Sequence, residues 1–264
     1  YGSRAANGVV VITTKQGKIG KPIFSYDGWV GIANVQRLPE LLDAFQYTDI
    51  KNEGLRNAGT YNASTLYYAL TNGPDGNPIN TRWYDYAYRQ GVSYNNSISV
   101  SGGSETTRYY FSANYTNQQG IIVKNDYKRL GATFNIDHQI SKSFTVGAKL
   151  QYANEDNLAV ISSGSLNGQA FGTAGLGRVA MVNAPNVSPY NNDGGYNLSG
   201  NNLGIMGNRV SQVGFYNPVV QIDLDRSYNY QNRIQSNAFI QYKPLPWISV
   251  KSVYGLDYLY SNKT

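Results

Sequence analysis

The sequence predicts an all-β protein that forms part of an antiparallel transmembrane β-barrel, and three observations lead to this fold class. Apolar and polar residues alternate over about ten residues in successive segments, as expected for strands with two different faces. Tight turns and longer connections follow each other in alternation along the chain. Tyrosine is frequent, at 24 of 264 residues, and charged residues reach only 14%, a composition that suits a barrel wall with aromatic residues at the membrane interfaces.

The composition also excludes other classes of protein. The sequence has no run of about 18 apolar residues, so it holds no candidate transmembrane helix. It has no cysteine, which excludes disulfide frameworks and zinc–thiolate sites. The net charge of +6 comes from scattered Lys and Arg residues rather than from one basic face, so we expect no nucleic-acid partner.

The first 18 residues differ from the rest of the chain. Residues 9–14 are a mainly β-branched run bounded by Gly8 and Gly17, which predicts a short buried strand. Asn7-Gly8 supplies a turn that accepts positive φ. Since the chain starts without a methionine or a signal peptide, we expect it to begin inside a larger motif.

The remaining segments are read in order. Strands are predicted over 21–35, 91–102, 107–119, 127–140, 144–154, 228–243 and 247–261. Leu41, Leu42, Phe45 and Ile50 have roughly helical spacing and predict a helix over 41–56, followed by a loop over 57–90. Residues 157–225 are a long excursion, with a short helix expected within 171–182, and 244–246 form a turn.

The alternation assigns side chains to the two faces of the wall. We expect the following to point to lipid: Phe111, Ala113, Tyr115, Phe134, Ile136, Val146, Ala148 and Leu150. We expect the following to point to the lumen: Asn114, Thr133, Asn135, Thr145 and Lys149. A shift of one residue would place Lys149 in hydrocarbon, at a cost of roughly 2–4 kcal/mol near the midplane.

Four stretches carry a resemblance to a known family. The motif YGSRAANGVVVITTKQGK resembles the segment that closes the plug domain of TonB-dependent outer-membrane transporters. The residues closest to the SusC/RagA branch of Bacteroidota are Tyr1, Gly2, Ser3, Arg4, Ala5, Ala6, Asn7 and Gly8. Residues 90–110, 118–129 and 178–194 resemble further strands and loops of that family, in the same order.

The resemblance implies a role in active transport across the bacterial outer membrane. Residues 1–18 would end the plug domain, and 19–264 would supply about seven of the roughly 22 strands of the barrel. The implied cargo is an oligosaccharide or an oligopeptide. The implied partners are a SusD-like lipoprotein lid, the TonB complex acting through residues upstream of Tyr1, the rest of the same barrel, and outer-membrane lipid.

The same reading places the long connections on the outer side of the membrane. A strand that leaves the plug runs outward, so the connections over 36–90, 120–126 and 157–225 would be extracellular. We expect the last of these to meet the lid or the cargo, because long ordered loops are usually functional.

Signals for catalysis or for cofactors are weak, and we expect neither an enzyme nor a cofactor. His138 is the only histidine and shares the apolar register of Phe134 and Ile136, which favours a wall residue at the membrane interface. Asp75, Asp85 and Asp193 are read as solvated turn residues, since the spacing of an EF-hand is missing.

Aromatic residues in the loops are the candidate contacts for a ligand or a lid. They are Trp83, Tyr84, Tyr86 and Tyr88, and also Tyr190 and Tyr196 with Asp193. An aromatic girdle or packing within the loops would explain the same residues. A cell-surface adhesive or structural protein, or a carbohydrate-binding module without transport, is the alternative function.

Overall fold

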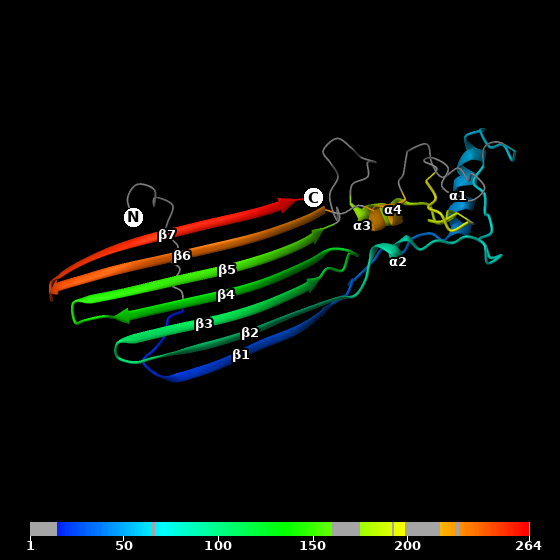
Figure 1. Cartoon of the computed structure of the whole chain (residues 1–264). Coiled ribbons are helices and arrows are strands. Elements are labelled where there is room, and N and C mark those ends of the chain that lie inside the picture. The colour runs from blue at the N-terminus through cyan, green and yellow to red at the C-terminus, as the bar shows by residue number, and fades with distance from the viewer. Residues whose placement is uncertain are drawn as a thin grey trace.

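Seven antiparallel strands form one open sheet in the computed structural model, which describes residues 15–64, 67–159, 175–191, 193–198, 217–224 and 227–263 (Figure 1). Each strand pairs with the one before it in the chain. The strands are β1 (Gly20–Ala33), β2 (Gly91–Gly103), β3 (Thr107–Gln119), β4 (Asp126–Gln139), β5 (Phe144–Ala159), β6 (Ser227–Leu245) and β7 (Ile248–Lys263). The predicted open antiparallel sheet is confirmed, and β1 and β7 each have one neighbour.

Several strand boundaries differ from those that the sequence predicts, and the largest difference is in β5. β5 continues to Ala159, past the predicted end at 154, because its ladder with β6 runs without a break to the pair Ala159–Ser227. The last turn is Pro246-Trp247 rather than 244–246, since a register shift after Tyr242 lets Leu245 still pair with Ile248.

Side chains on the two faces of the sheet differ as the alternation predicts. Directly paired residues project to the same face, so each paired row crosses the sheet. One such row is apolar: Phe24, Val100, Phe111, Phe134 and Leu150. The next row is polar: Ser25, Ser99, Ser112, Thr133 and Gln151. No apolar side chain of the described strand residues is buried, so the rest of the described chain leaves the apolar face uncovered.

The three long connections lie together at one end of the sheet (Figure 1). They carry the helices α1 (Ala44–Asn57), α2 (Trp83–Ala87), α3 (Leu176–Val182) and α4 (Pro218–Leu224). We call the described parts of 34–90, 120–125 and 175–224 the rim subdomain. The short turns lie at the opposite end, so the described parts of the three connections share one rim. No helix in the described residues is long and apolar enough to cross a membrane.

The main hydrophobic core of the described residues belongs to the rim subdomain rather than to the sheet. Its buried members come from α2, α3, α4 and the segment after α3: Trp83, Tyr84, Ala87, Leu176, Ala180, Ala184, Val187, Val219 and Ile222. Helix α2 lies inside the predicted loop 57–90, and α4 was not predicted either. Both helices are short, and packing rather than propensity stabilises helices of this length.

Hydrogen bonds join connections that are far apart in the sequence. Thr81 donates from its amide to the carbonyl of Pro185 at 2.7 Å, and from its hydroxyl to the carbonyl of Val187 at 2.6 Å. The Val123 amide donates to the carbonyl of Ala87 at 3.0 Å, which ties the middle connection to α2. The three connections therefore form one folded unit.

Replacing Trp83 with Ala tests this core. Trp83 is 3% exposed, so Trp83→Ala leaves a cavity and should destabilise the rim subdomain by about 3–5 kcal/mol. Hydrogen exchange of the whole protein should show α2 and α3 losing protection while the centres of β3, β4 and β5 keep theirs. Asp85→Ala, an exposed change on the same helix, is the matched control. Equal loss of protection in both variants would contradict the assignment of the core.

Candidate functional site

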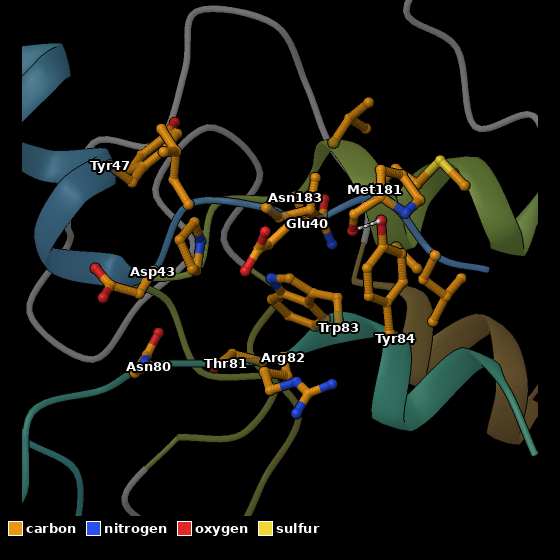
Figure 2. Close-up of a pocket in the computed structure, with 17 residues that line it drawn as sticks. Glu40, Asp43, Tyr47, Asn80, Thr81, Arg82, Trp83, Tyr84, Met181 and Asn183 are labelled. Carbon is orange, nitrogen blue, oxygen red and sulfur yellow. Dashed lines mark hydrogen bonds between the residues drawn. The ribbon is translucent and has the colours of Figure 1, made fainter.

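A cavity of about 710 Å³ opens in the rim subdomain, between the segment that precedes α1, the start of α2 and the end of α3 (Figure 2). Its volume lies within the range of about 300–1,000 Å³ that ligand pockets occupy. Its apolar lining includes Leu41, Leu42, Trp83 and Met181. Polar and charged lining comes from Glu40, Asp43, Asn80, Arg82 and Asn183. The cavity is thus mixed in chemistry, with aliphatic and aromatic walls and a few polar groups.

Local hydrogen bonds fix the two walls that come from the first long connection. Asp43 caps α1 by accepting the Gln46 amide at 2.8 Å, and Gln46 accepts the Asp43 amide in return at 3.2 Å. Asn80 accepts the amide of Ala44 at 3.0 Å, which joins the helix start to the strand-like segment before α2. These bonds use backbone donors that a helix N-terminus leaves unpaired.

Trp83 forms the apolar wall without leaving a polar group unsatisfied. Its indole Nε1 donates to the carbonyl of Ala184 at 2.9 Å. Tyr84, the next residue, donates its hydroxyl to the carbonyl of Pro39 at 3.4 Å. Burial raises the pKa of Tyr84, and Tyr88 adds to the rise. Both aromatic residues therefore fix the shape of the cavity.

Asn183 is the polar residue in the cavity that stands out. It directly follows α3 and is only 5% exposed, yet neither its side-chain oxygen nor its side-chain nitrogen has a hydrogen-bond partner among the described residues. Leaving a buried polar group unsatisfied costs roughly 1–3 kcal/mol. Asn217, which is equally buried, donates to the carbonyls of Pro189 and Asn197 and accepts the amide of Val219. Asn183 thus offers one donor group and one acceptor to whatever enters the cavity.

The predicted contact residues between 83 and 88 all lie in the rim subdomain, but they are buried to different extents. Trp83 and Tyr84 are buried, whereas Tyr86 is 37% exposed. Tyr88 is half-buried, packs edge-on against Tyr84 at 6.0 Å, and bridges to Ile122. Whether any of them contacts a ligand stays a prediction.

The second predicted group lies in the same subdomain. Tyr190 and Tyr196 stack at 5.8 Å, and Tyr196 donates its hydroxyl to Asp223 at 3.0 Å. The pKa of Tyr190 is raised by burial first, and then by Asp223 and Tyr86. Asp193 accepts the amide of Gly195 at 2.9 Å within its own turn. These contacts hold the loop together, and binding of a ligand by its exposed parts stays a prediction.

Other polar residues that the sequence singled out have partners in their own turns or strands. Asp75 accepts from the Asn77 side chain at 3.0 Å and from its amide at 3.1 Å, and these bonds lower the pKa of Asp75. Asp85 lies 3.7 Å from Arg82. His138 is paired with Val146 in the ladder, on the face of Phe134, and shares a hydrogen bond with the Thr107 hydroxyl at 2.7 Å.

The described start of the chain makes contacts on the polar face of the sheet. The backbone carbonyl of Lys15 accepts from the Asn135 side chain at 2.6 Å. A Cβ at Gly17 would lie 2.3 Å from the backbone nitrogen of Tyr109, so only glycine fits there. The described start of the chain therefore lies against the polar face of β3 and β4. The motif Tyr1, Gly2, Ser3, Arg4, Ala5, Ala6, Asn7 and Gly8 lies outside the described residues.

Comparison with known proteins shows that the chain is similar to TonB-dependent receptors. It is 31% identical over 206 residues to TonB-dependent receptor P3 of Formosa agariphila, which covers 77% of this chain and 18% of the relative. It is 28% identical over 222 residues to TonB-dependent receptor SusC of Bacteroides thetaiotaomicron. That match covers 83% of this chain and 19% of the relative. The chain thus spans about a fifth of the length of these relatives. No family model matches it.

The fold of the chain is that of a solved transporter. A chain of the RagAB peptide importer in its open-open state superposes with a TM-score of 0.68 and 20% identity, over 99% of this chain and 30% of the other. A second structure, of the RagAB peptide transporter, gives 0.68 with 22% identity. The seven strands correspond to part of a larger β-barrel.

Tyr47, on the wall of the cavity, gives the rim subdomain a dependence on alkaline pH. Burial raises the pKa of Tyr47 from 10.0 to about 12, and the edge-on neighbour Tyr68 adds to the rise. The folded state therefore keeps a proton that the unfolded chain loses. This contribution to stability is complete below the unfolded pKa and is lost as pH rises from about 10 to about 12. Denaturation midpoints should fall less steeply over this range in Tyr47→Phe than in the unchanged protein, and identical slopes would contradict the assignment.

Proposed function

Because the chain belongs to the SusC/RagA family of TonB-dependent receptors, we propose that it is part of an active transporter in the bacterial outer membrane that imports oligosaccharides or oligopeptides. The observation that carries this proposal is the open sheet with one apolar and one polar face, whose long connections all lie at one rim. A sheet with bare edges cannot face lipid, so the remaining strands of a closed barrel have to complete it.

The proposal gives each part of the chain a place. Residues 1–18 end the plug domain, and residues 15–18 lie against the polar face, which lines the lumen. Residues 19–264 form the first part of a barrel of roughly 22 strands. The apolar face contacts lipid, and the rim subdomain, with the connections 36–90 and 157–225, lies outside the cell.

We propose two kinds of partner for the transporter, and one of them meets the chain at its rim. A SusD-like lipoprotein lies over the rim subdomain, where Leu41, Leu42, Phe45 and Ile50 are between 43% and 53% exposed. An exposed apolar group of this kind is typical of an interaction site. The TonB complex is the second partner and supplies energy to the transporter. The proposal includes no catalytic step, and the named relatives are receptors.

Lysine substitutions on neighbouring strands test which face meets lipid. Leu150→Lys places a charge on the apolar face and should destabilise the barrel by roughly 2–4 kcal/mol near the midplane. Thr133→Lys places the same charge on the polar face and should have little effect. Assembly is measured as the fraction of the whole transporter in the outer membrane that stays folded on heating. Equal losses for the two variants would show that the faces are assigned wrongly.

Import is tested in a strain that depends on the transporter containing this chain. Uptake should require TonB, and purification of the transporter from the outer membrane should retain a surface lipoprotein. Phe45→Lys should reduce retention of the lipoprotein and uptake together, because it charges the exposed apolar group on α1. Asn57→Lys, an exposed change at the far end of the same helix, is the control. Unchanged uptake in a strain without TonB would exclude active import and favour an adhesive or binding role at the cell surface.

A further inference from the structure

We propose that the cavity in the rim subdomain is a binding site for a short peptide in extended conformation, and that Asn183 holds its backbone. Asn183 is buried, lines the cavity, and has both polar atoms of its side chain unpartnered among the described residues. The other buried asparagine compared above, Asn217, has both atoms engaged. Among the buried side chains of the described residues, Asn183 is the one in which both polar atoms lack a hydrogen bond.

The chemistry of a primary amide favours an extended peptide. A carboxamide presents one acceptor and one donor group side by side. In an extended chain, the N–H and the C=O of one residue point to the same side, which is how paired strands exchange two hydrogen bonds. Asn183 can therefore accept from that N–H and donate to that C=O at once.

An acetamido sugar fits this arrangement less well. The N–H and the C=O of a single trans amide point in opposite directions, so one such group satisfies only one of the two atoms of Asn183. A plain oligosaccharide presents hydroxyl groups, which need no fixed pair of this kind. The two unpartnered polar atoms of Asn183 therefore favour an extended peptide over an acetamido sugar or a plain oligosaccharide.

The walls of the cavity suit the rest of a short peptide. Leu41, Leu42, Trp83 and Met181 offer apolar surface to its side chains. Glu40 and Asp43 carry negative charge and Arg82 carries positive charge at the lining, which matches the charged ends of a free peptide. A volume of about 710 Å³ fits a small ligand rather than the broad surface that a folded partner buries.

Binding at this site does not depend on the proposed import function. A peptide can occupy the cavity in purified protein without TonB, a lid or a membrane potential. Loss of import with intact peptide binding would therefore contradict only the proposed function, and loss of peptide binding with intact import would contradict only this inference.

The test uses the whole transporter, purified in detergent without its lipoprotein, and an equimolar mixture of unlabelled pentapeptides. Peptide retained after equilibrium dialysis is measured by mass spectrometry. Asn183→Asp loses the donor and Asn183→Leu loses both groups, and each should weaken retention about tenfold. Met181→Trp narrows the cavity while Asn183 itself is kept, and it should weaken retention as well. Asn57→Asp, an exposed asparagine at the end of α1, should retain peptide like the unchanged protein.

A second arm examines the backbone contact itself. The best-retained pentapeptide is remade with an N-methyl group at each position in turn, and one position should cause a loss of about tenfold that Asn183→Leu does not deepen. The proposal is overturned if the unchanged protein retains no peptide, or if Asn183 variants retain as much. Competition by an N-acetylglucosamine tetramer that is stronger than competition by peptide would overturn it too. The proposal would also be overturned if the unchanged protein retained no free peptide and its Asn183 variants lost the lipoprotein.

Discussion

The two-residue period of the strand is the constraint on which the structure depends. Along every ladder, one residue projects to the apolar face and the next to the polar face, so a row such as Phe111, Phe134 and Leu150 lies beside a row such as Ser112, Thr133 and Gln151. A sheet with one apolar and one polar face is stable only where an apolar medium covers the apolar face. The absence of buried apolar side chains in the described strands follows from this requirement.

Because the sheet has no core of its own, the core of the described chain is at the rim. Trp83 and Val187 come from different connections and are both buried there. Backbone groups in these connections have no strand to pair with, so side chains such as Asn217 and Thr81 take their place as partners. The rim is consequently a small folded body carried by the sheet, and its cavity has fixed walls.

The strands and the common rim of the long connections were predictable because their signals are local: a period of two, and turns such as 104–106. The rim core was not. Trp83 was expected either to contact a ligand or to belong to an aromatic girdle or to packing within the loops. The sequence could not decide among these, since the carbonyl of Ala184 that Trp83 contacts lies a hundred residues further on. Asn183 gave no signal at all, because an unpaired side chain is recognised only when all its neighbours are in place. Helix α2 could not be predicted for the same reason, because packing against residues far away in the sequence stabilises it.

The pattern of short and long connections also bears on the route by which the sheet folds. Each of the pairs β2–β3, β4–β5 and β6–β7 is closed by a short turn, so each hairpin can form from local contacts. Joining β1 to β2, and β5 to β6, means closing the two long connections 34–90 and 160–226, and the entropy lost in this way grows with their length. Since all three connections share the rim, their folding shortens the effective loops at once. We therefore expect the rim core to favour the joining of separate hairpins into one sheet.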